Sequence, residues 1–350
     1  MITQFTEQNF LQFTLQHEWG TAIDVQQTLA NGTRMEIWDS GVVCFTPAQE
    51  ASPFDLVLSS AVHGDETAPI EICDSLIEAI RCGALQLKTR VLFLIANPAA
   101  INIGERFVEE NMNRLFSGAH SKGEVQNKER ERAKAIEGYV RRFYNEGGRG
   151  RQRMHYDMHT AIRDSKHEKF AVYPYQNGKP YSKRQLQLLA ALDVPVVLLH
   201  DGPTTTFSYF SVNEFAADAF TLELGKVRPF GENDMQKFAK TKQQLQHLLT
   251  EGYSSYEQSG NPNELAITIY KVLRSINRTQ ADFRLNFSAD LANFTAFRKG
   301  DVLAEDGDTQ IRAEVDGEAV IFPNANVAIG QRALLTVTPI EISAVRMNEQ

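Results

Sequence analysis

The sequence predicts an α/β fold in which a mainly parallel mixed sheet is flanked by helices and followed by a smaller C-terminal β-domain. Apolar runs rich in Val and Leu, without regular alternation, are typical of strands buried on both faces of a sheet. Amphipathic helical patterns separate these runs, as in βαβ units, where the strands are parallel. The runs lie at residues 54–60, 89–96 and 195–200.

The pattern changes near residue 255. Before this point strands alternate with helices; after it, short alternating strands are broken by Asn, Asp and Gly. We therefore expect a main domain over residues 1–254 and a small antiparallel β-domain over residues 255–350, packed against it. Strands in the second domain are expected at residues 283–287, 302–304, 319–322 and 334–337.

Local patterns predict the other elements of the main domain. An Asp-Ser-Gly turn predicts a hairpin between strands at residues 34–38 and 42–45. Apolar residues recur at helical spacing from Ile70 to Ile80, and Gly83 is placed to end that helix. We expect further helices at residues 7–15, 126–144, 184–192 and 234–249, and further strands at residues 154–158, 170–173 and 215–224.

Composition and charge argue against several classes of protein. The 350 residues carry a formal net charge of −8, which disfavours nucleic acid as the main partner. No apolar run is long enough to span a bilayer, and the N-terminus does not resemble a secretory signal, so we expect no membrane partner. Cys44, Cys73 and Cys82 form no paired or metal-binding spacing, which indicates reduced thiols in a cytoplasmic protein. The oligomeric state is not predicted.

A histidine and a carboxylate follow the first buried strand. His63 and Glu66 lie at its carboxyl end, where α/β sheets bind ligands, and the two side chains could close on one small cation. Gly64 between them allows a tight turn. The alternative is that Glu66 caps the first turn of the following helix beside a surface His. His63 and Glu66 alone do not decide between a cation site and a helix-capping Glu beside a surface His.

A catalytic zinc commonly takes three protein ligands and leaves one position for water, so a third ligand is needed from another strand end. On a strand, His155, Asp157 and His159 would share one face, and only His159 lies at the carboxyl end. We therefore choose His159 as the ligand and not His155, although a His in such a run is more often structural. Asp157 could orient a ligand imidazole, or pair with a neighbouring Lys or Arg.

The segment between residues 97 and 123 is long for a loop in a compact domain, and such loops are usually functional or disordered. It contains Arg106 and Arg114. Above a metal, two arginines suit bidentate recognition of a carboxylate or stabilisation of a developing oxyanion. Without a metal pair nearby, solvated surface arginines would be the favoured interpretation.

Glu223 lies inside an apolar strand, near its end. An acidic residue at such a position needs a reason, and a general base that faces a metal-activated water is one. A buried ion pair with Lys226 or Arg228 is the competing explanation.

These residues, in this order, resemble the zinc carboxypeptidase-like superfamily, and most closely its aspartoacylase/succinylglutamate desuccinylase branch. The resemblance runs from about residue 53 to the C-terminus. Met158 stands where Leu is expected, and Asp65 where Asn is frequent, but neither side chain should coordinate a metal. The motifs that carry it are His63-Gly64-Asp65-Glu66, Arg106, Asn113-Arg114, Asp157-Met158-His159 and Glu223, with the fuller strings at residues 157–163 and 221–226.

The resemblance implies one Zn²⁺ per chain and a small-molecule substrate with several carboxylates. It implies hydrolysis of N-succinyl-L-glutamate to succinate and L-glutamate, the last step of arginine breakdown by the arginine succinyltransferase route. The alternatives are a sister deacylase of another N-acyl amino acid and a non-catalytic metal- or ligand-binding protein. The implied roles are zinc ligand for His63, Glu66 and His159, base for Glu223, oxyanion stabiliser for Arg106 and carboxylate binding for Asn113 and Arg114, with Arg163, Lys226 and Arg228 as weaker candidates for the other carboxylates.

Overall fold

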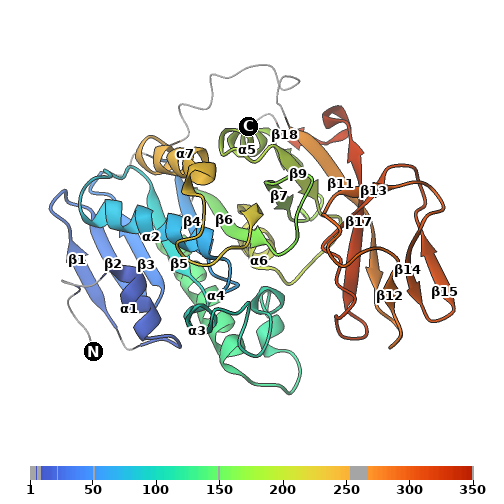
Figure 1. Ribbon diagram of the computed structural model, residues 1–350. Coiled ribbons are helices and arrows are strands. Elements are labelled where there is room, and N and C mark those ends of the chain that lie inside the picture. Colours follow the sequence, from blue (N-terminus) through green and yellow to red (C-terminus); the bar gives the residue numbers. More distant parts are fainter. Residues whose placement is uncertain are drawn as a thin grey trace.

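The computed structural model describes residues 5, 9–21, 23–49, 52–148, 150–252 and 267–348. Within these residues, one large mixed sheet crosses the molecule, and helices lie on both of its faces (Figure 1). The predicted fold class is confirmed.

The large sheet, as far as the chain is described, has 13 strands. In spatial order they are β1 (Val25–Thr28), β2 (Arg34–Asp39), β3 (Val42–Thr46), β5 (Arg90–Ile95), β4 (Phe54–Ser60), β6 (Gln152–Ala161), β10 (Asp218–Lys226), β7 (Phe170–Tyr173), β9 (Val196–Leu199), β11 (Thr268–Asn277), β17 (Arg332–Ile340), β16 (Glu318–Ile321) and β13 (Thr295–Phe297).

The middle of this sheet is parallel: β5 pairs with β4, β4 with β6, and β6 with β10. β2 and β3 form the predicted hairpin, which joins the parallel strands through an antiparallel pair between β3 and β5. β7 is antiparallel to β10 and parallel to β9. Because β4, β6 and β10 run in one direction, their carboxyl ends meet at the same edge of the sheet, where ligands bind in this class of fold.

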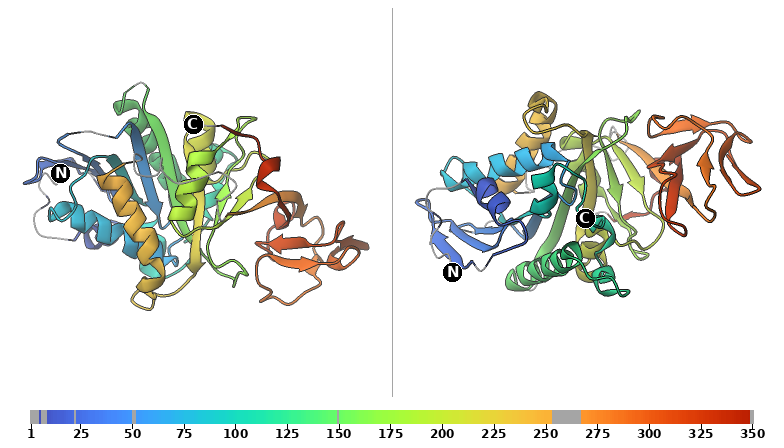
Figure 2. Two further views of the ribbon diagram at one scale, coloured as in Figure 1. Left: turned by 90° about the horizontal axis from the view of Figure 1, so that it is seen from above. Right: turned by 60° about the horizontal axis from the view of Figure 1, so that its bottom comes forward.

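Helices cover both faces of the sheet because successive side chains of a strand point to opposite sides (Figure 2). On β4, Leu56 and Leu58 join the core on one face, whereas Val57 joins the core on the other. The first core includes α1 (Phe10–Gln16), α2 (Thr67–Arg81), α5 (Lys183–Ala191) and α7 (Ala239–Thr250); the second includes α4 (Lys128–Glu146) and α6 (Phe207–Phe215). No described helix is both long enough and apolar enough to cross a membrane.

Asparagine side chains begin two helices near the edge that carries the site. At the start of α3 (Pro98–Ile103), Asn97 Oδ1 accepts the N–H of Ala100 (3.3 Å). At the start of α4, Asn127 Oδ1 accepts the N–H of Arg130 (2.9 Å). Each bond satisfies one of the N–H groups that a helix leaves without an internal partner. The α2 helix has no such side-chain cap.

The C-terminal part continues the large sheet. β11 is parallel to β9 and antiparallel to β17, and Phe170 and Leu198 share an apolar core with Val272 and Phe294. The predicted boundary between residues 254 and 255 lies outside the described residues, so the division into domains stays a prediction. Two smaller sheets are formed by β12 (Arg284–Leu285), β14 (Val302–Asp306) and β15 (Thr309–Arg312), and by β8 (Tyr181–Ser182) with β18 (Met347–Asn348).

Candidate metal and active site

Three strand ends supply the candidate residues. His63 follows β4 in the turn that leads to α2, and Glu66 directly precedes the first residue of that helix. His159 lies near the end of β6, and Glu223 is its register partner on the neighbouring strand β10. All four side chains are buried, although they lie at the ends of strands, where polar residues are usually exposed.

The turn between His63 and Glu66 is pressed against α3. A Cβ atom at Gly64 would lie 2.2 Å from the carbonyl carbon of Ala100, so a larger residue fits only if the backbone moves. The Gly64 N–H donates to the carbonyl oxygen of Arg106 (3.2 Å). This glycine is therefore required by close packing of two backbone segments rather than by an unusual φ.

The carboxylate of Glu66 lies between two imidazoles. Its Oε1 is 2.9 Å from Nδ1 of His63, and its Oε2 is 2.9 Å from Nδ1 of His159. Oε1 also accepts from Nη1 of Arg106 (2.7 Å), and Oε2 accepts the N–H of Thr160 (3.0 Å). The Glu66 side chain makes no capping bond to α2, and His63 is only 2% exposed, so the interpretation as a capping Glu beside a surface His is wrong.

The outer nitrogen of each imidazole has its own acceptor. Nε2 of His63 lies 3.0 Å from Oδ1 of Asn111, and that atom is the oxygen because it also accepts the N–H of Asn113 (3.0 Å). Nε2 of His159 lies 2.9 Å from Oδ2 of Asp157. Each Nε2 therefore carries a proton, and each Nδ1 is directed at Glu66.

These residues fit a bound metal ion. Ligand atoms of His63, Glu66 and His159 all lie within 4.8 Å of one another, and two imidazole nitrogens with one carboxylate oxygen form a ligand set that catalytic zinc uses. Burial and the nearby Arg106 guanidinium lower the pKa of His63 to about 4, so this imidazole is neutral, as a ligand must be. Burial alone would lower the pKa of His159, but Asp157 and Glu66 outweigh it and raise that pKa well above its usual value. These two carboxylates thus stabilise positive charge on the His159 imidazole, and a bound cation would replace its Nδ1 proton.

Glu223 is buried beside this cluster, with no hydrogen bond or ion pair to any residue that the structure describes. Glu223 is 7% exposed, and its Oε2 accepts no hydrogen bond from any described residue. Among the described residues Glu223 forms no ion pair with Lys226 or Arg228, and Lys226 pairs instead with Asp164 (2.8 Å). Burial raises the pKa of Glu223 to about 7. A carboxylate with such a pKa can take up and release a proton near neutral pH.

His155, on the same face of β6, is kept apart from the metal cluster. Its Nε2 lies 2.8 Å from Oγ of Ser59, and its Nδ1 lies 2.8 Å from Oγ of Ser211. The Ser59 hydroxyl donates to Oδ1 of Asp157 (2.6 Å), so His155 must donate its Nε2–H to Ser59. Asp157 is therefore held by Ser59 on one side and accepts from His159 on the other, which makes it the residue that orients this imidazole.

The loop after α3 brings three further candidates toward this edge. Arg106 donates to Glu66, as described above. Oδ1 of Asn113 accepts the N–H of Phe207 at the start of α6 (2.9 Å). Arg114 ends the short 3₁₀ helix Met112–Arg114, is exposed, and forms no ion pair with any described residue; its Nη1 donates only to the carbonyl oxygen of Asn113 (2.9 Å). Its guanidinium is thus available to an external anion.

Arg163 is placed differently. It follows β6 and donates from Nη1 to the carbonyl oxygen of Ala289 in the C-terminal part of the chain. It forms no hydrogen bond with the described residues of the metal cluster. Its guanidinium is thus bound by a backbone carbonyl outside the loop that carries Asn113 and Arg114.

Sequence reasoning missed His200 and Arg332. His200 follows β9, and its Nε2 is buried without a hydrogen-bond partner among the described residues. Arg332 begins β17, and its side chain forms no hydrogen bond or ion pair with any described residue. Burial, and then the charge of Arg332, lower the pKa of His200, and Arg114 lowers it further, so the two guanidiniums form a positively charged region around a neutral imidazole. No motif marks Arg332, because only the folding of the C-terminal part brings it here.

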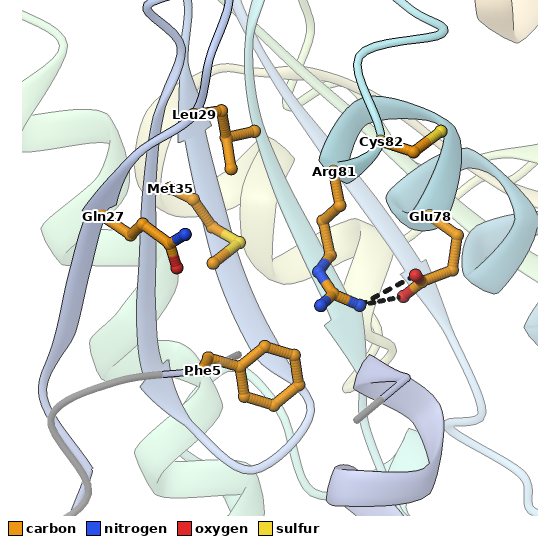
Figure 3. Close-up of a pocket in the computed structure, with 7 residues that line it drawn as sticks. All are labelled: Phe5, Gln27, Leu29, Met35, Glu78, Arg81 and Cys82. Atoms are coloured by element: carbon orange, nitrogen blue, oxygen red, sulfur yellow. Dashed lines mark hydrogen bonds and ion pairs between the residues drawn. The ribbon is translucent and has the colours of Figure 1, made fainter. Parts of the chain in front are cut away.

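A separate pocket of about 310 Å³ lies at the C-terminal end of α2, the opposite end from Glu66 (Figure 3). Its one arginine, Arg81, already pairs with Glu78 (2.6 Å), as the figure shows. The pocket therefore offers no free charge and none of the predicted site residues. Its lining residues are Phe5, Gln27, Leu29, Met35, Glu78, Arg81 and Cys82.

Comparison with known proteins agrees with this geometry. The family model of the Succinylglutamate desuccinylase/Aspartoacylase catalytic domain matches residues 54–249. A second model, the AstE/AspA barrel-sandwich hybrid domain, matches residues 265–340. The catalytic model thus covers the four buried residues of the cluster, and the second covers the C-terminal strands.

Two relatives that match over nearly their whole length carry the same name. A succinylglutamate desuccinylase from Idiomarina loihiensis is 56% identical over 336 residues, which cover 95% of this chain and 96% of the relative. Another from Shewanella amazonensis is 51% identical and covers 95% of both chains. The X-ray structure of the Vibrio parahaemolyticus succinylglutamate desuccinylase superimposes with a TM-score of 0.87 at 35% identity and covers 97% of both chains. The resemblance identified from the motifs is confirmed, and the chain belongs to the succinylglutamate desuccinylase/aspartoacylase family.

Proposed function

We propose that this protein is a zinc-dependent amidohydrolase that cleaves N-succinyl-L-glutamate into succinate and L-glutamate, as the last step of arginine breakdown by the arginine succinyltransferase pathway. The observation that carries the proposal is the convergence of two imidazole Nδ1 atoms on Glu66, beside the buried carboxylate of Glu223, whose Oε2 has no hydrogen-bond partner among the described residues. The names of the relatives support the choice of substrate.

His63, Glu66 and His159 would hold one zinc ion per chain. Zinc bound there would supply Lewis-acid chemistry, which polarises a carbonyl oxygen and acidifies water. Asn111 and Asp157 keep the outer nitrogen of each ligand imidazole protonated, so that Nδ1 faces the metal position.

Glu223 would move the proton. It takes a proton from the attacking water and passes it to the amide nitrogen as the bond between carbonyl carbon and nitrogen breaks, so that succinate and the free amine of glutamate leave. Arg106 donates to the ligand carboxylate, which places a positive charge directly beside the reacting centre. There it would stabilise the oxyanion of the tetrahedral intermediate.

The substrate has three carboxylates, and the positively charged region described above is suited to them. Arg114 and Arg332 have no acidic partner among the described residues, and Asn113 keeps its amide N–H groups for a ligand because its oxygen is used by α6. We assign one carboxylate to Arg114 with Asn113, and a second to Arg332 near His200. Arg163 remains a weaker candidate, since its guanidinium already donates to a carbonyl.

Zinc content and activity on a panel of N-acyl amino acids test this proposal. We expect one zinc per chain, loss of activity with a chelator, and faster turnover of succinyl-glutamate than of acetyl-aspartate. Preference for acetyl-aspartate would identify a sister deacylase instead. Active enzyme without stoichiometric metal would contradict the zinc assignment.

The variant Glu223→Gln separates an enzyme from a binding protein. It keeps the shape of the side chain but cannot accept a proton from water. General-base catalysis typically contributes about a hundred- to ten-thousand-fold, so we expect a fall in kcat of that order with unchanged zinc content and substrate binding. Normal turnover would show that another residue is the base, and loss of zinc would show that Glu223 is a ligand.

A further inference from the structure

The loop that carries Arg106 and Asn111 has little packing of its own. Phe107 and Val108 are 38% and 39% exposed, so apolar burial does not hold this segment in place. Both ends of the loop nevertheless reach the metal cluster, through Arg106 on one ligand carboxylate and Asn111 on one ligand imidazole. Something else must fix the backbone between them.

One buried carboxylate binds this backbone. Glu129, in the first turn of α4, is 0% exposed. Its Oε1 accepts the N–H of Val108 (2.8 Å), and its Oε2 accepts the N–H groups of Glu109 (2.8 Å) and Glu110 (2.6 Å). Three consecutive backbone donors thus converge on one side chain, an arrangement that binds an anion well. A fourth donor, Nδ2 of Asn97, reaches Oε1 (2.8 Å).

The fourth donor connects the loop to the strand ends. Asn97 follows β5, and its own N–H donates to the carbonyl oxygen of Ala61 (2.9 Å), two residues before His63. Glu129 therefore binds the loop and the edge that presents the ligand His63 at the same time. Charge-assisted bonds of this kind are shorter and stronger than bonds between neutral groups.

We infer that Glu129 is a positioning residue that holds Arg106 over the reacting centre. The bonded N–H groups begin two residues after Arg106 and end one residue before Asn111, so the backbone is fixed between the two side chains that contact the cluster. The inference rests on the role proposed above for Arg106. Glu129 touches neither metal ligand nor substrate, and it acts only through the loop.

Glu137 provides a matched control. It lies on the same helix two turns later, is 1% exposed, and also accepts a backbone N–H from the preceding segment, that of Gly118 (3.1 Å). The segment it holds comes after Arg114, and no hydrogen bond or ion pair joins that segment to the cluster among the described residues. A substitution at either position removes a buried carboxylate from α4. Only a substitution at Glu129 also removes the acceptor that fixes the backbone after Arg106.

A double-mutant cycle tests this inference at saturating zinc. In Glu129→Gln one carboxylate oxygen becomes an N–H₂ group and the other a weaker acceptor, and these face four donors. We therefore expect kcat to fall at least about tenfold, and at most by the hundred- to thousandfold that loss of an oxyanion donor typically causes. In the Arg106→Ala background the same change should alter kcat less than about twofold, because the group it positions is already absent. Glu137→Gln should change kcat less than about twofold in both backgrounds. An equal loss from Glu129→Gln in both backgrounds would overturn the inference.

Amide hydrogen exchange on the wild-type protein gives a test that needs neither a variant nor catalysis. The amides of Val108, Glu109 and Glu110 should be strongly protected, although they belong to an exposed loop. Exchange at the rate of an unstructured peptide would overturn the role of Glu129. An inactive wild-type protein with these amides protected would contradict the proposed function and leave the placement of the loop supported.

Discussion

His155 and His159 lie on the same strand and the same face, both almost fully buried, yet their surroundings are opposite. His155 contacts two hydroxyl groups, and burial lowers its pKa to about 4. His159 lies between two carboxylates, which overcome burial and raise its pKa well above the usual value. Burial therefore does not decide whether a histidine in this sheet can serve a metal. What separates the two histidines is their contact with Glu66, which lies 2.9 Å from Nδ1 of His159, whereas both ring nitrogens of His155 face serine hydroxyls.

The position along the strand explains the difference. In the middle of β6 the neighbours come from β4 and from α6, which supply Ser59 and Ser211. At the carboxyl end, β4 has finished and the turn before α2 brings Glu66 into the space above the sheet. Strand ends thus allow loops to place charged groups that the packed middle of a sheet would not accommodate.

The two alanine variants should give the largest contrast. His159→Ala removes one of three ligands and should abolish both stoichiometric zinc binding and activity. His155→Ala should keep zinc and most activity, at a cost in stability from its two lost hydrogen bonds. Metal analysis after gel filtration, together with turnover, checks both. Zinc retained in His159→Ala and lost in His155→Ala would show that the wrong histidine was assigned.

Asp157→Asn tests whether the negative charge of the carboxylate that accepts from His159 strengthens zinc binding. The amide can keep one acceptor for Nε2–H but removes the negative charge, and loss of such outer partners typically lowers metal affinity about ten- to a hundredfold. Competition with a zinc chelator measures the change. Ser211→Ala, which alters only the surroundings of His155, is the matched control and should leave zinc affinity unchanged. Equal affinities in Asp157→Asn and wild type would rule out this electrostatic role.

Arg114→Lys tests a residue of the loop beyond the strand ends, where we expect a substrate carboxylate to bind. Lysine keeps the charge but loses the planar fork that binds a carboxylate with two parallel bonds. A charge-assisted hydrogen bond contributes about 1.5–3 kcal/mol, so we expect apparent affinity for succinyl-glutamate to fall roughly tenfold or more. Steady-state kinetics at saturating zinc measure this. Unchanged kinetics would place Arg114 outside the substrate pocket.

Features encoded by local patterns could be predicted from the sequence. The buried strand β4, the turn at Gly64 and the amphipathic helix α2 each follow from a few neighbouring residues. The helix α6 was missed because residues 207–212 are buried on every side, which leaves no helical periodicity. The short helix α3 was missed inside the predicted loop for a related reason, because four of its six residues are buried.

The residues of the candidate site also fall into those that local sequence patterns predict and those that only the fold reveals. His63, Glu66, His159 and Glu223 could be proposed because each stands at or near the end of a recognisable strand. Asn111 and Glu129 could not, since their roles depend on which loop backbone and which imidazole the fold brings to them. An acidic residue in the first turn of a charged amphipathic helix is ordinarily a solvated one, and nothing local distinguishes Glu129 from its neighbours.

The smallest expected effect concerns His155 and stability in acid. Its pKa is about 4 in the folded protein against an ordinary value of 6.5 in the unfolded chain. Between these values the unfolded chain binds a proton that the folded chain does not, so the free energy of unfolding falls as the pH drops from 6.5 toward 4. A difference of this size in pKa corresponds to at most about 3 kcal/mol.

His155→Gln isolates this contribution. Glutamine can donate to one serine and accept from the other but does not titrate, and all other acidic and basic groups are common to both proteins. Urea unfolding of the metal-free proteins at pH 7 and pH 4.5 should therefore show a fall in the free energy of unfolding that is smaller in the variant by about 2 kcal/mol. Groups that do not interact with His155 titrate equally in the two proteins, so their contribution cancels in this difference. An equal fall in both would mean that His155 takes up its proton without unfolding, and that the hydroxyl surroundings tolerate charge as well as the carboxylates around His159 do.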